Sequence, residues 1–435
     1  MLTLKNKEQK LFVDWKIFIP SFLISVIGIL TLTSTELSAT GEILDADIII
    51  KQIIFVAVGI IIYLLLSKLD LTYLKHWQVI LVIYILTIAL LIATLIWGPV
   101  INNVKRWIII GGVQIQPAEI AKATVILTTA LIFSMKDKYN EWLLFLISFL
   151  FVIPIFILIY LQPSGSMSIL VIFIWFVVAF TGLGNQLRNF LLLLIIGLIS
   201  SGIFLYTITS SPLWFLLSGA GLFISILCFY ARESWKIFVV SAVVLGSLLG
   251  IGLDYAWDNI LHDYQKERVE AFIYPEETQE DIGFNVAQSR IAIGSGQIWG
   301  KGFGNGTQSK RNFLPEHQTD FIFASFAEEF GLVGSVILLG IYGFLIVVIF
   351  LVSMKYFDNI FFSMLTVGVG FKILLELFIN IGTNTGTIPA TGIPLPLMSA
   401  GGSITVMTFV CLGLIQAVKN SSRESITSAS FIDIS

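Results

Sequence analysis

Residues 77–97 read WQVILVIYILTIALLIATLIW, a run of 21 residues without one charged side chain. A transmembrane helix needs about 20 predominantly apolar residues to cross the hydrocarbon core of a bilayer. This run is therefore predicted to span a membrane. Similar apolar runs lie on both sides of it, so most of the chain is predicted to lie within the lipid bilayer.

The composition supports this interpretation. Hydrophobic residues make up 57% of the 435 positions, charged residues make up 12%, and the mean hydropathy is +0.93. A soluble domain carries about 25% charged residues. The net charge of −3 provides no basic surface for binding a phosphate backbone, so no nucleic-acid partner is expected.

The pattern of apolar runs predicts an all-α polytopic membrane protein with about twelve transmembrane helices. The predicted spans lie near 16–34, 50–67, 77–97, 120–134, 141–161, 167–185, 188–208, 212–230, 235–253, 320–352, 358–381 and 397–419. We expect residues 1–435 to form a single transmembrane domain, with one large loop at 254–319 before the last three helices. The serine-rich tail, 420–435, is predicted to be disordered.

The distribution of basic residues predicts the orientation. With twelve spans and a cytoplasmic start, lysine and arginine concentrate on the cytoplasmic side, as the positive-inside rule requires. These residues are Lys5, Lys7, Lys10, Lys16, Lys68, Lys75, Lys136, Lys138, Arg188, Arg232, Lys236, Lys355, Lys419 and Arg423. Both termini are then cytoplasmic, and the loop at 254–319 lies outside.

A first polar cluster on the predicted outer side combines Arg106 with Glu119 and Lys122. Glu119 and Lys122 are three residues apart after Pro117, so they share a helix face and can form an ion pair. One interpretation is an interfacial pair. The other is an anion site for a diphosphate head group, because charged groups at membrane depth are costly and usually have a role.

The large loop forms the second cluster and contains the glycine-rich stretch GKGFGNGTQ, 300–308. Glycine-rich loops can cradle phosphate through backbone N–H groups. This stretch fits neither the P-loop nor the dinucleotide pattern, and simple flexibility would explain it equally well.

Asp320 is the most distinctive single residue, because it stands where the loop re-enters the membrane before Phe321. Burial of a carboxylate at such a boundary would suit a general base acting on a sugar hydroxyl. The alternative is an N-cap, in which Asp320 or Thr319 satisfies free N–H groups of the next helix. Glu328 shares roughly the same helix face and is expected near the same polar cavity.

A third cluster, 380–403, is rich in glycine and proline between two spans. This composition predicts irregular backbone at membrane depth, which requires burial in protein or a wet cavity. In the preceding helix, Lys372 and Glu376 are four residues apart and are expected to pair.

Five stretches of the chain together resemble the SEDS family (shape, elongation, division and sporulation), which contains RodA and FtsW. They are KRWIIIGGVQIQPAEIAKA (105–123), DYQKERVEAF (263–272), QSRIAIGSGQIWGKGFGNGTQ (288–308), FLPEHQTDFIFASFAEEFGLVG (313–334) and NIGTNTGTIPATGIPLPLMSAGGS (380–403). The stretch GKGFGNGTQS is more similar to RodA than to FtsW.

The resemblance implies a peptidoglycan glycosyltransferase in the bacterial plasma membrane that polymerises lipid II outside the cell and releases undecaprenyl diphosphate. It implies a class B penicillin-binding protein as the transpeptidase partner and a role in elongation and cell shape. Asp320 is the implied catalytic residue. The substrate-binding residues expected with it are Arg106, Glu119, Lys122, Gln308, Glu316, Thr319 and Ser399. A divalent cation, Mg²⁺ or Mn²⁺, would be held mainly by the substrate diphosphate, because no carboxylate cage is visible in the sequence.

Three features depart from the family pattern. Gln318 stands where the family has a histidine, with His317 one position earlier, and Ser164 replaces the aspartate of a QPDxGT motif. The spans at 212–230 and 235–253 add a pair to the family's ten helices.

Other functions are an FtsW-like division polymerase, a lipid II flippase, or a scaffold without catalysis. A flippase needs charged residues on a path near the midplane, whereas the polar clusters here lie on the outer side.

Overall fold

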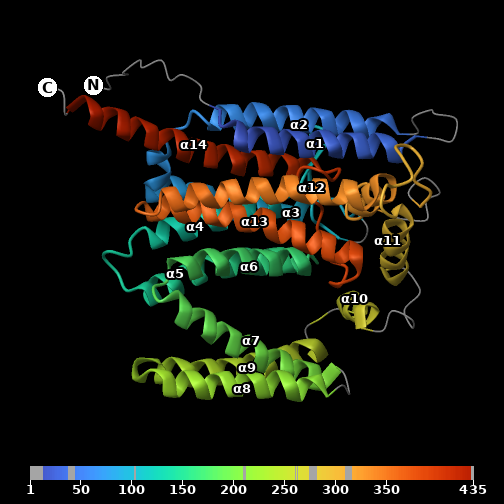
Figure 1. Cartoon of the computed structure of the whole chain (residues 1–435). Helices are drawn as coiled ribbons and strands as arrows, with labels where there is room; N and C mark the ends of the chain where they lie inside the picture. The colour runs from blue at the N-terminus through green and yellow to red at the C-terminus, as the bar shows by residue number, and fades with distance from the viewer. Residues whose placement is uncertain are drawn as a thin grey trace. The chain divides into compact units, whose positions relative to one another are not determined.

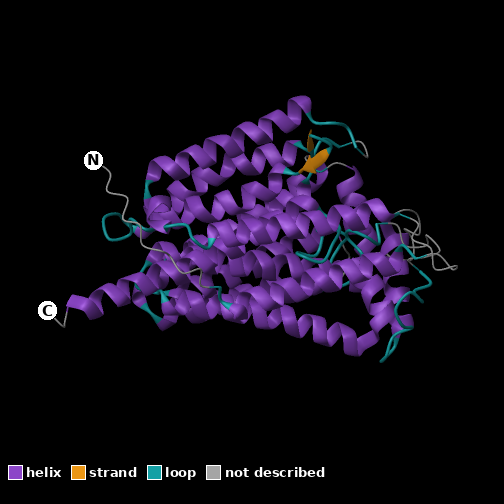
Figure 2. Ribbon diagram, turned by 90° about the horizontal axis from the view of Figure 1, so that it is seen from above, coloured by secondary structure: helices purple, strands orange, loops and turns teal. Residues whose placement is uncertain are grey.

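The computed structural model describes residues 13–37, 45–101, 104–208, 212–259, 261, 263–273, 282–308 and 316–432. Within these ranges the chain forms fourteen α-helices, two short 3-10 helices and one two-stranded hairpin (Figures 1 and 2). Eleven of the described helices are long and apolar enough to cross a membrane. The predicted all-α polytopic class is confirmed.

The chain divides into two compact units, 1–182 with 271–435, and 183–270. The first unit contains α1 (Trp15–Thr35), α2 (Ala46–Leu66), α3 (Trp77–Trp97), β1 (Ile108–Ile110), β2 (Val113–Ile115), α4 (Pro117–Phe133), α5 (Glu141–Leu161), α6 (Gly165–Gly182), α11 (Ile282–Gly296), α12 (Ile322–Lys355), α13 (Ile360–Thr385) and α14 (Gly402–Ile432). The second contains α7 (Gln186–Ile208), α8 (Leu213–Ala231) and α9 (Lys236–Asn259), and α10 (Asp263–Ile273) crosses the boundary between the units.

Helix α4 lies at the centre of the first unit, where it packs against α3, α5, α6, α13 and α14. All its side chains from Ala121 to Phe133 are buried. It has 17 residues and corresponds to the short span predicted at 120–134. Because protein surrounds α4, its polar side chains meet other helices rather than lipid.

The last helix, α14, begins at Gly402, five residues later than predicted, and packs along α2 (Figure 1). Residues Ile393, Leu395, Leu397 and Met398 are buried without being helical. They are apolar enough to resemble a span, whereas the neighbouring prolines and glycines stop a helix. At its other end α14 continues to Ile432, through most of the tail for which the sequence predicts disorder.

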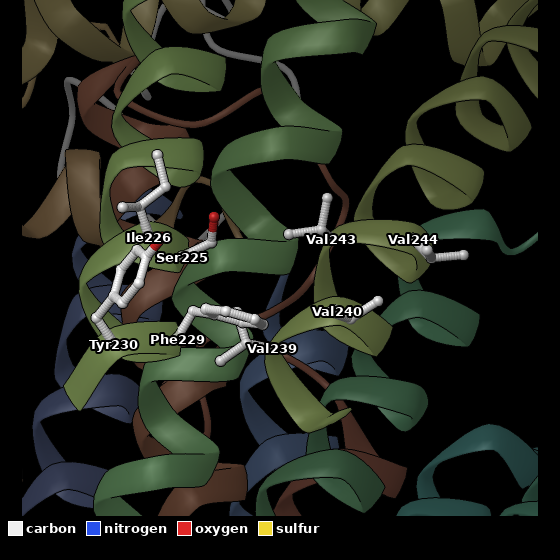
Figure 3. Close-up of a pocket in the computed structure, with 8 residues that line it drawn as sticks. All are labelled: Ser225, Ile226, Phe229, Tyr230, Val239, Val240, Val243 and Val244. Atoms are coloured by element: carbon white, nitrogen blue, oxygen red, sulfur yellow. The ribbon is translucent and has the colours of Figure 1, made fainter. Parts of the chain in front are cut away.

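The second unit packs α7 against α8 and α9 around Ile195, Ile199, Cys228, Trp235, Val239 and Ala242. A groove of about 310 Å³ lies between α8 and α9 (Figure 3). It is lined by Ser225, Ile226, Phe229, Tyr230, Val239, Val240, Val243 and Val244. None of these side chains carries a formal charge at neutral pH, and the only side chains among them with hydroxyl groups are Ser225 and Tyr230.

Helix α12 is broken at Gly331, whose backbone angles are φ 65° and ψ −163°. Two N–H groups after the break donate to the segment that follows α11. Leu332 N–H donates to the Gln297 carbonyl (2.8 Å), and Val333 N–H donates to the Ile298 carbonyl (3.1 Å). Two carbonyls before the break accept from the same segment, Glu328 from Lys301 N–H (3.0 Å) and Glu329 from Gly302 N–H (2.9 Å).

The loop after α11 therefore replaces the hydrogen bonds that the break removes from α12. Backbone polar groups at membrane depth must be satisfied within the protein, and these four contacts achieve this. They also attach the glycine-rich stretch, 300–308, to α12 about two turns after its first residue, Ile322.

We predict that Gly331→Ala lowers the free energy of unfolding by roughly 2 kcal/mol or more. An alanine is strained at this φ and ψ, and its Cβ would lie 2.4 Å from the Gly300 nitrogen and 2.6 Å from the Ile298 carbonyl oxygen. Thermal unfolding in detergent measures the effect. The matched control is Gly343→Ala in the same helix, where a Cβ meets nothing within 4 Å. Equal Tm values for the two variants would contradict the prediction.

Candidate active site

Asp320 lies in the turn that precedes α12 and is partly exposed. Its main-chain carbonyl accepts two hydrogen bonds from α13, one from Asn380 Nδ2 (2.9 Å) and one from Asn384 Nδ2 (2.9 Å). Both asparagine side chains are buried. The backbone of the candidate base is therefore fixed by a neighbouring helix rather than by its own.

The two residues before Asp320 are held in the same way from a second element. Ser399 Oγ donates to the Thr319 carbonyl (2.6 Å), and Ala400 N–H donates to the Gln318 carbonyl (2.9 Å). Gln52 of α2 in turn holds the segment that contains Ser399. Its Nε2 donates to the Ser399 carbonyl (3.1 Å), and its Oε1 accepts from Gly401 N–H (3.2 Å).

The N-terminus of α12 is capped from α13. Phe321 is the N-cap residue, and its apolar side chain cannot accept a hydrogen bond from the backbone. Asn384 Oδ1 instead accepts from the N–H of Ala324 (3.1 Å), the third helical residue. A capping side chain usually binds an N–H in this first turn, so Asn384 satisfies one that Thr319 or Asp320 was expected to take.

Four polar residues follow one face of α13 at intervals of four, namely Lys372, Glu376, Asn380 and Asn384. This spacing places them in line along the helix. The two asparagines contact Asp320. The other two form the ion pair predicted from the sequence, with Lys372 Nζ 2.8 Å from Glu376 Oε2.

That pair extends into a chain of four buried charges. Lys122 Nζ of α4 lies 2.5 Å from Glu376 Oε1 and 2.6 Å from Glu119 Oε1. All four side chains have no exposed surface. The predicted pairing of Glu119 with Lys122 is confirmed. Substrate binding by these two residues stays a prediction, and in this structure both are enclosed between helices.

The other predicted substrate-binding residues lie in three places. Arg106, before β1, donates through an Nη group to the Pro163 carbonyl, next to the buried Ser164 that departs from the family pattern. Glu316 accepts from the Thr319 hydroxyl (2.9 Å) in the turn of Asp320. Gln308 belongs to the glycine-rich stretch. Their contact with substrate stays a prediction.

The glycine-rich stretch encloses a carboxylate of the protein itself. Glu328 accepts hydrogen bonds from Thr307 N–H (2.8 Å), Gln308 N–H (3.1 Å) and Lys301 Nζ (2.5 Å). Two of the N–H groups that were candidates for a phosphate cradle are therefore occupied by Glu328. The buried Glu328 acts as the internal anion around which the loop folds.

Residues 317 and 318, where the sequence departs from the family, both face Glu36 at the end of α1. Gln318 Nε2 donates to Glu36 Oε1 at 2.5 Å, and His317 Nε2 lies 3.6 Å from the same oxygen. Nearby on α1, Ser34 donates to Glu329 (2.5 Å) and accepts from Gly304 N–H (2.7 Å). These contacts attach α1 to the beginning of α12.

Sequence analysis missed Gln52, Ser34 and Glu36. The available signal was their polarity at or near apolar spans, since polar groups at membrane depth usually have a role. Asn380 and Asn384 lie in a stretch that resembles the family, but no function was predicted for either side chain. Among the described residues, no group of three or more His, Cys, Asp or Glu side chains is arranged to hold a metal ion. The described residues thus provide no metal cage.

A bundle of membrane-spanning helices, in which the backbone of one aspartate is clamped where an irregular loop enters the bundle, defines a polytopic membrane protein with a loop-borne polar site. The family model that describes FtsW, RodA and SpoVE, each a cell cycle protein, matches residues 14–212 and 217–424. The chain belongs to this family, which confirms the resemblance to SEDS proteins.

Curated relatives resemble the chain over nearly its whole length. The peptidoglycan glycosyltransferase MrdB of Escherichia coli K12 is 30% identical over 418 residues, 95% of this chain and 96% of that protein. The peptidoglycan glycosyltransferase RodA of Treponema pallidum is 29% identical and covers 93% of this chain and 97% of that protein.

Solved structures share the fold. One is from a peptidoglycan synthase complex in which polymerization and crosslinking are coordinated, with a TM-score of 0.68, 24% identity and coverage of 95% of this chain and 99% of that one. Another is the crystal structure of the rod shape-determining protein RodA of Thermus thermophilus, with a TM-score of 0.57, 22% identity and coverage of 93% and 96%.

We predict that Lys122→Met lowers the free energy of unfolding by about 3–5 kcal/mol, because it leaves an uncompensated buried negative charge. The double variant Lys122→Met/Glu119→Gln removes one positive and one negative charge. The remaining Lys372–Glu376 pair then has no net charge. The double variant is expected to recover more than half of that loss. Thermal unfolding of both variants in detergent measures the difference. A double variant no more stable than the single one would show that charge balance does not govern this cluster.

Proposed function

We propose that this protein is a peptidoglycan glycosyltransferase that polymerises lipid II into glycan strands during cell elongation and shape maintenance. The relatives that carry this name cover more than nine-tenths of the chain. The observation that supports the proposal most strongly is the clamped turn, because it fixes the backbone of the partly exposed Asp320 at the entrance to the helix bundle.

Asp320 acts as general base in this proposal. Its carboxylate removes the proton from the 4-hydroxyl of the acceptor sugar as that oxygen attacks the anomeric carbon of the donor chain. The bond between the anomeric carbon and the diphosphate oxygen breaks, and undecaprenyl diphosphate leaves with the bonding electrons. Positioned general bases contribute about 10²–10⁴-fold to rate.

Charge on the leaving diphosphate needs a cation near the same boundary. Among the predicted substrate-binding residues, Arg106 suits this role better than Lys122. Arg106 is half-buried, whereas Lys122 is enclosed between helices. A divalent cation would be carried in by the diphosphate, and no step of this mechanism depends on a protein cage for it.

The site works outside the cell in this proposal. The protein resides in the bacterial plasma membrane with both termini cytoplasmic and the loop at 254–319 outside, as the positive-inside pattern predicts. A class B penicillin-binding protein is the proposed partner. The fold match to a complex that coordinates polymerization with crosslinking supports such a pairing. An FtsW-like role in division is the second candidate, since relatives named FtsW also match.

The test is polymerisation of purified lipid II by the full chain, with and without the partner. We expect glycan strands from the wild type and at least a 10²-fold lower rate from Asp320→Ala. Asp358→Ala is the matched control, because it makes the same side-chain change at an exposed position in the turn between α12 and α13, outside the turn of Asp320. It is expected to keep a larger share of the activity than Asp320→Ala.

A parallel assay of lipid II movement across vesicles separates the alternatives. Movement without polymerisation, unchanged by Asp320→Ala, would support a flippase and contradict the proposal. If the folded protein with its partner shows neither polymerisation nor lipid II movement, the result would support a scaffold. That result would also contradict the proposed function.

A further inference from the structure

One side chain, Asn384, forms hydrogen bonds on both sides of the junction between the turn of Asp320 and α12. Its Nδ2 donates to the Asp320 carbonyl (2.9 Å) and to the Asn380 carbonyl (2.8 Å), and its Oδ1 accepts from Ala324 N–H (3.1 Å). We propose that Asn384 is a positioning residue for catalysis, which fixes Asp320 by bridging it to the first turn of α12. This inference rests on the proposed function.

The bridge joins the two ends of a short segment. Asp320 and Ala324 are four residues apart, and between them the chain changes from an irregular turn into a helix. One planar amide that binds both ends fixes the direction in which the chain leaves Asp320. A planar amide presents a donor and an acceptor side by side in a fixed geometry.

Asn384 is itself rigidly held. It has no exposed surface, and its main-chain carbonyl accepts from Ser289 Oγ of α11 (2.8 Å). One turn earlier, Asn380 donates to the Asp320 carbonyl and also to the Ile393 carbonyl (2.9 Å). Asn384 thus links α11, α12 and α13 next to Asp320, the proposed general base.

The assignment of oxygen and nitrogen in the amide follows from its partners. Ala324 offers an N–H and Asp320 offers a carbonyl oxygen, so only one orientation of the amide satisfies both. Leucine has the same number of side-chain heavy atoms and the same branching but can form neither hydrogen bond. In Asn384→Leu, we expect the turn to lose its fixed direction, and the rate is therefore measured per folded molecule.

A shift of about 1 Å in a catalytic group can reduce the rate about 10²-fold. We therefore expect Asn384→Leu to lower kcat per folded molecule by roughly 10–100-fold. KM for lipid II should change less than about twofold, because Asn384 is buried away from the substrate.

The matched control is Asn359→Ala, at the other end of α13. Asn359 caps that helix by accepting from Phe362 N–H (3.4 Å), so its loss weakens the same helix without touching the turn of Asp320. We expect a lower Tm with kcat retained in the folded fraction.

The decisive experiment is a double-mutant cycle in the lipid II polymerisation assay. It compares Asn384→Leu in the wild-type background with the same substitution added to Asp320→Ala. If Asn384 acts through Asp320, the loss seen in the wild-type background shrinks to about twofold or less once Asp320 is absent.

Two results would overturn the inference. One is an unchanged kcat for folded Asn384→Leu. The other is an equal fold-loss in both backgrounds, which indicates a structural role independent of Asp320. Failure of the proposed function is distinguishable, because the wild-type chain with its partner would then form no glycan strands.

Discussion

Backbone polar groups inside a membrane protein must find partners in the protein itself, and this constraint shapes the whole site. Regular helices satisfy it without help. The chain departs from helix before α12, at Gly331 and between α13 and α14, and each departure leaves N–H and carbonyl groups to be satisfied. The partners are Asn380, Asn384, Ser399 and the segment 297–302. The turn of Asp320 is fixed because these groups are satisfied there.

Buried charge follows a similar rule. Glu119, Lys122, Lys372 and Glu376 form two acidic and two basic groups in one enclosed chain, so the cluster is neutral as a whole. Breaking such a cluster is costly because the remaining charge is left in a medium of low dielectric. The cluster lies one helical turn from Asn380 on the same face of α13. It therefore orients the helix that holds the candidate base.

The spans could be predicted from the sequence because apolar runs of about 20 residues report the bilayer thickness directly. The pair formed by Lys372 and Glu376 could be predicted because four-residue spacing is local. The link from Lys122 to Glu376 crosses 254 positions, and no local pattern in one sequence reveals it. The start of α14 was predicted five residues too early because the buried, non-helical Leu397 and Met398 are as apolar as a span. Asp320 was found through the family motif, whereas its clamp by Asn384 became visible only in three dimensions.

In the proposed function, the clamped Asp320 works on the outer face of the membrane. Its sidedness can be measured with a cysteine at Glu316, an exposed position in the same turn, after the buried Cys228 and Cys411 are replaced by serine. A membrane-impermeant maleimide is added to right-side-out membrane vesicles. We expect full labelling without permeabilisation, and labelling only after the vesicles are opened would show that Asp320 faces the cytoplasm.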